Sequence, residues 1–240
     1  MEYLDLSRRI RFPDPRTANP WGIVAQGGNL SPGVLISAYE QGIFPWYEED
    51  PILWFSPDPR FVLFLEEFSI PRRLLRTIRN SSRQVTFDRS FSTVIEECRR
   101  PRRNSGGTWI TEEMVQGYRE LHALGKAHSV EVWEEDRLVG GLYGVSVGRT
   151  FSGESMFSRE RDAGKFALVA LVGLLRSWEV TFIDCQSYTP HMAAFGAREV
   201  PREAYLELIE SLVRVRPGIP GNWNRNDAME ALSNEIRCHR

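Results

Sequence analysis

An acid, a thiol and an amide occupy three consecutive positions, Asp184, Cys185 and Gln186, at the end of the stretch VTFIDCQ. Side chains alternate across a strand, so Asp184 and Gln186 project to one face and Cys185 to the other. We expect the acid and the amide to face a site at the carboxyl end of the strand, where crevices form in α/β sheets. Cys185 is then a small core residue. A Cys185–His191 nucleophile pair is the alternative, although no nucleophile elbow surrounds it.

A second carboxylate, Glu154, interrupts the apolar and small residues of FSGESMFS (151–158). Two interpretations are open. Strand alternation turns this side chain to solvent at a sheet edge, or the fold holds it for function.

Arginine is concentrated between residues 71 and 103, where ten arginines meet three acids. This segment has a net charge of +7, so the rest of the chain, with −2 in total, carries −9. The stretch PRRLLRTIRN predicts an amphipathic helix over 71–80 with its leucines and isoleucine inward. Arg72, Arg76 and Arg79 fall on one outer stripe. Guanidinium groups at one-turn spacing suit phosphates, and a solvated helix face is the alternative.

The composition of the 240 residues is that of a globular protein, with 42% hydrophobic and 26% charged residues. The net charge of −2 gives no global signal for DNA, and no apolar run is long enough to span a membrane. Three cysteines without paired spacing argue against a disulfide framework or a zinc site. We therefore expect a cytoplasmic protein without a metal.

Two domains are expected from the changing patterns along the chain. Residues 1–60 predict a small, loop-rich N-terminal domain, and residues 61–240 a larger α/β (α+β) domain. The larger domain is expected to contain helices, a hairpin turning near Glu135 and Asp136, and an apolar helix over about 163–177. The strand ending at Gln186 follows. The tail from about residue 215 is rich in Pro, Gly and Asn and predicts little.

This order of elements is of the N-acetyltransferase (GNAT) kind, in which the long helix follows an antiparallel meander. An acyl-CoA loop would precede that helix. The sequence RDAGKFA (161–167) matches such a loop only in part, because Phe166 stands where Gly or Ala is expected. An acyl-CoA-dependent N-acetyltransferase is therefore one alternative function.

Several stretches, in unbroken order from about residue 5 to 215, resemble one family. They are GGNLSPGVLISAYEQGIFPWY (27–47), PILWFSPDPR (51–60), GGTWIT (106–111), GYRELHALGKAHSVEVW (117–133), LVGGLYGV (138–145), FSGESMFS (151–158) and IDCQ (183–186). Together they resemble the leucyl/phenylalanyl-tRNA–protein transferases, bacterial aminoacyltransferases of the N-degron pathway. The resemblance implies a small N-terminal domain joined to an acetyltransferase-like C-terminal domain.

The resemblance also implies a reaction. Leu, Phe or Met moves from aminoacyl-tRNA to the N-terminal Arg or Lys of an acceptor protein and marks it for degradation, with no cofactor. The donor ester is already activated, so no protein nucleophile is needed, and positioning is the larger catalytic contribution. A noncatalytic tRNA-binding protein is the alternative from another class.

Residue roles follow from the same resemblance. Asp184, Gln186 and Glu154 are the catalytic candidates: Asp184 polarises Gln186 by a hydrogen bond, Gln186 orients the amine, and Glu154 meets the positive charge of the acceptor. Arg72, Arg76 and Arg79 would hold the acceptor stem of the tRNA through its phosphates. Aromatic residues match positions around the terminal adenosine and the aminoacyl side chain, with core packing as the alternative for each: Tyr39, Trp46, Trp109, Tyr118 and Phe151.

One position departs from the family pattern. Thr189 stands where an Asn is expected three residues after Gln186, whereas His191 is kept. This departure bears on substrate range or rate.

Overall fold

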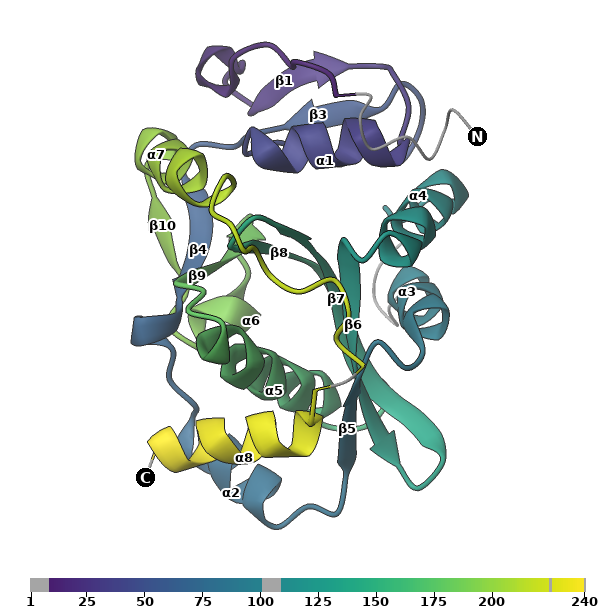
Figure 1. Ribbon diagram of the computed structural model, residues 1–240, viewed down its shortest axis with the longest axis vertical. Coiled ribbons are helices and arrows are strands. Elements are labelled where there is room, and N and C mark those ends of the chain that lie inside the picture. The colour runs from purple at the N-terminus through teal and green to yellow at the C-terminus, as the bar shows by residue number, and fades with distance from the viewer. Residues whose placement is uncertain (1–8, 101–108, 225, 240) are drawn as a thin grey trace.

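The computed structural model describes residues 9–100, 109–224 and 226–239. A three-stranded sheet has the order β1-β3-β2, and a seven-stranded sheet has the order β10-β4-β9-β8-β7-β6-β5. The small sheet and α1 lie at one end of the molecule, and α2 and α8 lie at the other (Figure 1). The strands of the small sheet are β1 (Ile23–Gln26), β2 (Phe44–Pro45) and β3 (Leu53–Phe55).

The large sheet is mixed. Strands β8 and β9 run parallel, and every other neighbouring pair is antiparallel. A parallel pair needs a crossover, which α5 supplies. This order of meander, long helix and strand confirms the predicted α/β class. The strands are β4 (Arg60–Phe64), β5 (Gln84–Phe87), β6 (Ala127–Glu134), β7 (Arg137–Val147), β8 (Thr150–Ser158), β9 (Phe182–Gln186) and β10 (Arg198–Val200).

The helices agree with the main sequence signals. Helix α5 covers the predicted range, and eleven of its fifteen residues are buried, which explains why its sequence is apolar all round. The predicted hairpin turn is also confirmed, since β6 ends at Glu134 and β7 begins at Arg137. The helices are α1 (Pro32–Glu40), α2 (Arg72–Arg79), α3 (Phe91–Arg99), α4 (Glu112–Ala123), α5 (Ala163–Ser177), α6 (Pro190–Ala193), α7 (Arg202–Leu212) and α8 (Ala228–Cys238).

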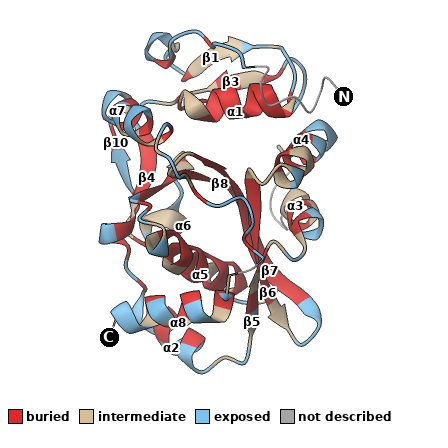
Figure 2. Ribbon diagram, viewed as in Figure 1, coloured by how far each residue is buried: buried red, intermediate tan, exposed pale blue. Residues whose placement is uncertain are grey.

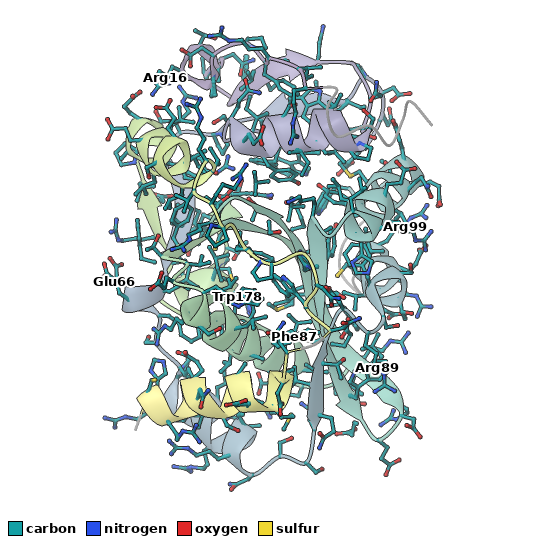
Figure 3. The ribbon with its side chains drawn as sticks, viewed as in Figure 1. Arg16, Glu66, Phe87, Arg89, Arg99 and Trp178 are labelled. Atoms are coloured by element: carbon teal, nitrogen blue, oxygen red, sulfur yellow. The ribbon has the colours of Figure 1, made fainter. Side chains whose placement is uncertain are left out.

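Hydrophobic side chains pack on both faces of the large sheet. One cluster joins the sheet to α2, α5 and α8, and the other joins it to α1, α3, α4 and α7. Figure 2 shows α5 and the central strands as mostly buried. Charged side chains such as those of Arg16, Glu66 and Arg99 lie at the periphery, whereas Phe87 lies inside (Figure 3). Residues on the α1 side of β8 and β9 are therefore shielded from water.

The tail beyond residue 215 is part of the packed structure, although its sequence predicted little. Helix α8 packs on α5, where a side chain at Gly173 would meet the carbonyl oxygen of Ala231 at 2.3 Å. Trp223 is fully buried and stacks on His128 with ring centroids 4.1 Å apart. The tail thus closes one face of the core.

Helix α1, from the first sixty residues, packs against α4 and β7. A domain division near residue 60 stays a prediction. Arg102, Arg103 and the residues 106–108 of GGTWIT lie outside the described residues. Among the helices that the structure describes, none combines the length and apolarity that crossing a bilayer requires.

Candidate active site

Glu154 lies at the centre of a cluster built from four elements. Its Oε1 accepts hydrogen bonds from the hydroxyl of Tyr39 on α1 at 2.8 Å and from Nε2 of Gln186 on β9 at 2.7 Å. Its Oε2 accepts one from the hydroxyl of Tyr118 on α4 at 2.9 Å. Glu154 is 8% exposed. The structure therefore resolves the ambiguity in the sequence: this carboxylate is enclosed and not turned to solvent at a sheet edge.

The two tyrosine hydroxyls also lie 2.7 Å from each other. Tyr39, Tyr118 and Glu154 thus make three short O···O contacts among themselves. An ionised Glu154 leaves only two hydroxyl protons for three contacts, since each tyrosine carries one. A protonated Glu154 supplies the third. The ring of contacts is therefore fully hydrogen-bonded only when the carboxyl is neutral.

Burial, together with the nearby charge of Asp184, raises the pKa of Glu154 to about 7. The hydrogen bonds from Tyr39, Tyr118 and Gln186 act in the opposite direction because they favour the charged form. A carboxyl group with this pKa exchanges its proton near neutral pH, which is the property of a general base.

Asp184 has a different environment, because Arg60 binds it at two points. Nε of Arg60 lies 2.8 Å from Oδ1 and Nη2 lies 2.6 Å from Oδ2, with both side chains 1% exposed. The hydroxyl of Tyr205 at 2.9 Å and that of Ser152 at 3.3 Å also donate to Oδ2. The backbone N–H of Gln186 is the fifth donor to this carboxylate. A carboxylate has about four acceptor positions. Asp184 is saturated by protein groups.

Asp184 and Gln186 are joined by a hydrogen bond, as predicted, and the donor is the backbone of Gln186 and not its side-chain amide. Oδ1 of Asp184 accepts from the backbone N–H of Gln186 at 2.9 Å. Gln186 has a φ of 64°, a left-handed conformation that a residue with a side chain rarely adopts without support. Asp184 supplies that support and holds the Gln186 side chain toward Glu154.

The alternation predicted for β9 is confirmed by the packing of its side chains. Asp184 and Gln186 lie on the face toward Glu154, and Cys185 packs with the α5 side of the core. Burial raises the pKa of the Cys185 thiol well above its ordinary value, so the thiolate needed for a nucleophile is disfavoured. This argues against the Cys185–His191 alternative.

The structure brings only some of the predicted aromatic residues together. Tyr39 and Tyr118 contact Glu154, and their hydroxyls are part of the cluster. Trp46 is 46% exposed and packs on Phe55 with ring centroids 5.6 Å apart, and Trp109 is half-buried. Phe151 is fully buried on the opposite side of β8, 5.6 Å from the ring of Trp223. Phe151 is therefore a core residue in this structure and does not contact Glu154.

The predicted arginine stripe lies on α2. Leu74, Leu75 and Ile78 are buried, as predicted, while the three arginines face solvent: Arg72, Arg76 and Arg79. Arg79 approaches the carbonyl oxygen of Ile236 at 3.4 Å. Helix α2 lies at the end of the molecule opposite α1 (Figure 1). The stripe is therefore well separated from Glu154.

Thr189 precedes α6 and caps it, because its hydroxyl accepts the backbone N–H of Met192 at 3.1 Å. Threonine and asparagine are both favoured at this position of a helix. The departure from the family pattern therefore preserves one structural task of the residue.

Arg60 and its partner Tyr205 belong to the site, although the sequence does not single them out as site residues. The guanidinium of Arg60 lies between the rings of Phe44 and Tyr205, at 4.7 and 4.4 Å from their centroids. Its signals in the sequence are its place at the end of the family stretch PILWFSPDPR (51–60) and a single cation before the apolar run FVLFL. Nothing in that pattern indicates a partner 124 residues away.

Comparison with known proteins gives a consistent result. A family model described as leucyl/phenylalanyl-tRNA protein transferase matches residues 62–210, and a model of the N-terminal domain of these transferases matches residues 28–58. A leucyl/phenylalanyl-tRNA–protein transferase of Syntrophus aciditrophicus is 51% identical over 228 residues, covering 93% of this chain and 94% of the relative. One of Anaeromyxobacter sp. (strain Fw109-5) is 51% identical over 221 residues, covering 91% of this chain and 94% of that protein.

Among solved structures, a conserved protein of unknown function from Staphylococcus epidermidis has a TM-score of 0.41 at 10% identity. The match covers 60% of this chain and 57% of that protein, and this likeness is too slight to bear on function. The family models and the close relatives decide the matter: this chain belongs to the leucyl/phenylalanyl-tRNA–protein transferase family.

Proposed function

We propose that this protein is an aminoacyltransferase that moves leucine, phenylalanine or methionine from tRNA to the α-amine of an acceptor protein with N-terminal Arg or Lys, marking it for degradation. The observation that carries the proposal is the enclosed cluster of Glu154, Gln186, Tyr39 and Tyr118 in a chain of this family. It offers a carboxylate and an amide oxygen to a cationic substrate, and none of its four side chains is a cysteine or a serine.

The chemistry requires only that the two substrates meet. The amine nitrogen attacks the ester carbonyl carbon, the new C–N bond forms, and the bond to the ribose oxygen of the terminal adenosine breaks. The ribose hydroxyl leaves with a proton, and the amine loses one. Holding the reactants in the attacking geometry contributes about 7–11 kcal/mol to such a reaction. An enclosed and rigid cluster suits that task.

Glu154 is the residue proposed to receive the acceptor amine. A carboxylate has about four acceptor positions, and protein groups fill three of those on Glu154. The remaining position is on Oε2, which has Tyr118 as its one donor. An α-amine has a pKa of about 7.7–8.0 and arrives mostly as ammonium at pH 7. Glu154, with a pKa of about 7, is matched to bind that ammonium and to accept its proton.

Gln186 is proposed to orient the amine. Its Nε2 is engaged by Glu154, so its amide oxygen points to the other side and is available as an acceptor for an N–H group. A neutral amide is too weakly basic to take a proton. Gln186 therefore fixes direction, and Asp184 is a positioning residue that acts through the backbone of Gln186.

The aromatic residues would bind the donor. Trp46 and Trp109 are proposed to stack on the terminal adenosine, since single-stranded RNA ends are held on aromatic faces. Arg72, Arg76 and Arg79 are proposed to contact tRNA phosphates. Accepting leucine, phenylalanine and methionine alike is natural for an apolar pocket, which separates side chains differing by one methylene only about 10- to 200-fold.

A transfer assay tests the proposal. Labelled Leu-tRNA is incubated with the protein and a peptide beginning with Arg, beside a matched peptide beginning with Ala. Label is expected on the Arg peptide alone. Label on neither peptide, with the tRNA still bound, would favour a noncatalytic tRNA-binding protein. Consumption of acetyl-CoA with either peptide would favour an N-acetyltransferase.

The role of Glu154 is tested in the same assay. Glu154→Gln is expected to raise the KM for the Arg peptide at least tenfold while the affinity for Leu-tRNA stays unchanged. Glu199→Gln, an exposed carboxylate on β10, is the matched control and should leave both quantities as they are. An unchanged KM in Glu154→Gln would remove the proposed role.

A further inference from the structure

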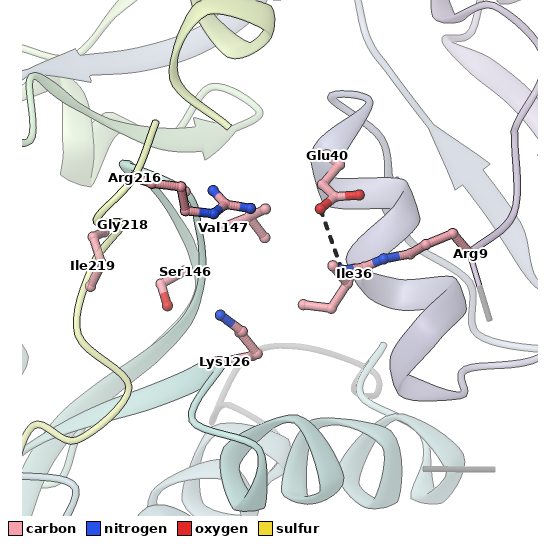
Figure 4. Close-up of a pocket in the computed structure, with 10 residues that line it drawn as sticks. Arg9, Ile36, Glu40, Lys126, Ser146, Val147, Arg216, Gly218 and Ile219 are labelled. Carbon is pink, nitrogen blue, oxygen red and sulfur yellow. Dashed lines mark ion pairs between the residues drawn. The ribbon is translucent and has the colours of Figure 1, made fainter. Parts of the chain in front are cut away.

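Three cations from three distant segments line one cavity that contains none of the residues of the Glu154 cluster. The cavity has a volume of about 150 Å³ and lies between α1, the start of β6, the end of β7 and the loop at 216–219. Arg9, Lys126 and Arg216 line it, with Glu40 as the single carboxylate (Figure 4). The lining therefore has a net charge of +2.

We propose that this cavity is a phosphate-binding site, formed by Lys126, Arg216 and Arg9 around the buried hydroxyl of Ser146. Guanidinium groups bind phosphate oxygens through paired N–H groups, and a lysine adds a compact charge. Ser146 is 2% exposed and offers a hydroxyl donor beside them. These groups are cations and hydrogen-bond donors, so they favour an anionic ligand over an apolar or cationic one.

The cations are only partly satisfied within the described residues. Arg9 forms an ion pair with Glu40 at 3.4 Å, so the one carboxylate is already engaged. Arg216 donates Nη1 to the carbonyl oxygens of Val213 and Val215, and no described carboxylate pairs with it. The ammonium of Lys126 forms no ion pair with any residue that the structure describes. Partial burial lowers the pKa of Lys126, and the charges of Arg216 and Arg9 lower it further. An anion would relieve this repulsion.

The cavity is a built feature of the fold. The backbone N–H of Ile219 donates to the carbonyl oxygen of Gly148 at 2.7 Å, and this fixes the loop of Arg216 to the turn after β7. A side chain at Gly218 would meet that same carbonyl at 2.6 Å. The backbone N–H of Ser146 donates to the carbonyl oxygen of Lys126 at 2.8 Å, which ties the two strands together. The positions of Arg216 and Lys126 are therefore fixed relative to each other.

The tRNA substrate of the proposed function carries phosphates. We choose tRNA as the source of the bound phosphate on the basis of that proposed function. Glu40 lines the cavity, and the preceding residue, Tyr39, donates a hydrogen bond to Glu154. The two sites thus adjoin the same turn of α1. A phosphodiester bound in the cavity would belong to the single-stranded 3′ end of the tRNA, a few nucleotides from the aminoacyl ester. A free phosphate is the other source of the same chemistry.

The experiment measures binding and needs no transfer. Affinity of the full-length protein for uncharged, fluorescently labelled tRNA is measured by anisotropy over a range of salt concentrations. Lys126→Met keeps the aliphatic stem and removes the charge. It is expected to weaken binding about tenfold and to reduce the salt slope by about one. Arg216→Gln should act in the same direction. Arg137→Gln, an exposed cation at the tip of the β6–β7 hairpin, is the control and should change neither.

Glu40→Gln provides a test of sign. Removing the only carboxylate of the cavity leaves its charge more positive, so tRNA is expected to bind more tightly. General damage to the fold would weaken binding instead, and thermal unfolding of each variant shows whether the fold is kept.

A second arm distinguishes the source of the phosphate. The unfolding temperature is followed as inorganic phosphate is added to the unaltered protein and to Lys126→Met. One outcome is that phosphate stabilises the unaltered protein and not Lys126→Met, while the two proteins bind tRNA equally well. That result would support the phosphate site and assign it to a free anion. Equal tRNA affinities with no selective stabilisation by phosphate would overturn the proposal. A protein that binds tRNA through Lys126 but transfers nothing would contradict the proposed function and not this site.

Discussion

Arg60 and Asp184 form a two-point ion pair in which both side chains are 1% exposed, with nitrogen–oxygen distances of 2.8 and 2.6 Å. The pair joins the beginning of β4 to β9. Asp184 lies two residues before Gln186, whose side chain contacts Glu154. Because Asp184 is occupied by Arg60, it cannot serve a substrate directly. We therefore expect Asp184 to affect activity through the conformation of Gln186.

Removing one partner of this pair leaves a buried charge without compensation. Arg60→Met is therefore expected to lower the free energy of unfolding by about 3 to 5 kcal/mol, measured by urea denaturation. The double variant Arg60→Met/Asp184→Leu should recover part of that loss. Arg198→Met, which breaks an exposed pair with Glu67, is the comparison and should cost at most about 1 kcal/mol. A similar small loss in Arg60→Met would contradict the importance given to the buried pair.

Gln186 is expected to act on the rate and not on tRNA binding. Gln186→Ala should lower kcat by about 100-fold, the effect typical of a misplaced reactant, with the affinity for tRNA unchanged. Gln186→Gly tolerates the positive φ and should lose as much activity while keeping stability closer to that of the unaltered protein. Full activity in either variant would show that the amide does not orient the amine.

Stability should depend on pH through Glu154. Its pKa is about 7 in the folded protein and 4.5 ordinarily, so the folded state holds the proton more tightly. The contribution from the neutral carboxyl is fully present below pH 4.5 and is lost as pH rises to about 7, amounting to about 3 kcal/mol. Subtracting the free energy of unfolding of Glu154→Gln at each pH isolates this change. A flat difference across pH 4.5–7 would mean that the carboxyl is already ionised when folded.

Tyr39 sets the pH at which Glu154 ionises. Its hydroxyl lowers the pKa of Glu154 by hydrogen bonding, so Tyr39→Phe is expected to raise that pKa. The acidic limb of the pH profile of kcat/KM for the acceptor should then move to higher pH. Tyr47→Phe removes a hydroxyl bonded to Thr111 and Glu113, outside the cluster, and should leave the profile in place. A shift to lower pH in Tyr39→Phe would mean instead that the hydroxyl of Tyr39 stabilises the neutral carboxyl of Glu154.

The arginine stripe of α2 is expected to make a separate contribution to tRNA binding. Arg76→Ala is expected to reduce the slope of log affinity against log salt by about one, with no change in the KM for the acceptor. Thr77→Ala, an exposed neighbour on α2, should not alter the slope. An unchanged slope in Arg76→Ala would indicate that the stripe is a solvated helix face.

Much of the chemistry of β9 could be predicted from its sequence because strand alternation is a local property. The alternation placed Asp184 and Gln186 on one face and Cys185 on the other, as the structure has them. The partners of these residues could not be predicted, because they lie on other segments. Arg60 is 124 residues from Asp184, and Tyr39 is 115 residues from Glu154. No periodicity in the chain reports such a contact.

The same reason explains why the surroundings of Phe151 and the packing of the tail could not be predicted. Phe151 is adjacent in sequence to Ser152, which contacts Asp184, yet it packs against Trp223 from the tail. A tail rich in Pro, Gly and Asn shows little periodicity, so its buried Trp223 was not anticipated. Only the packed structure shows that the two aromatic rings are neighbours.

The packing of α8 on α5 shows that the packed structure extends past the stretch that the family model matches. The family model ends its match at residue 210, whereas the buried side chains continue through Trp223, Ala228 and Leu232. A shortened protein made to the limits of the match would expose one side of α5 and leave His128 without the ring that covers it. The stretch that the family model matches is thus shorter than the packed structure to which the tail belongs. Protein engineering that divides or fuses the chain must follow the larger limit.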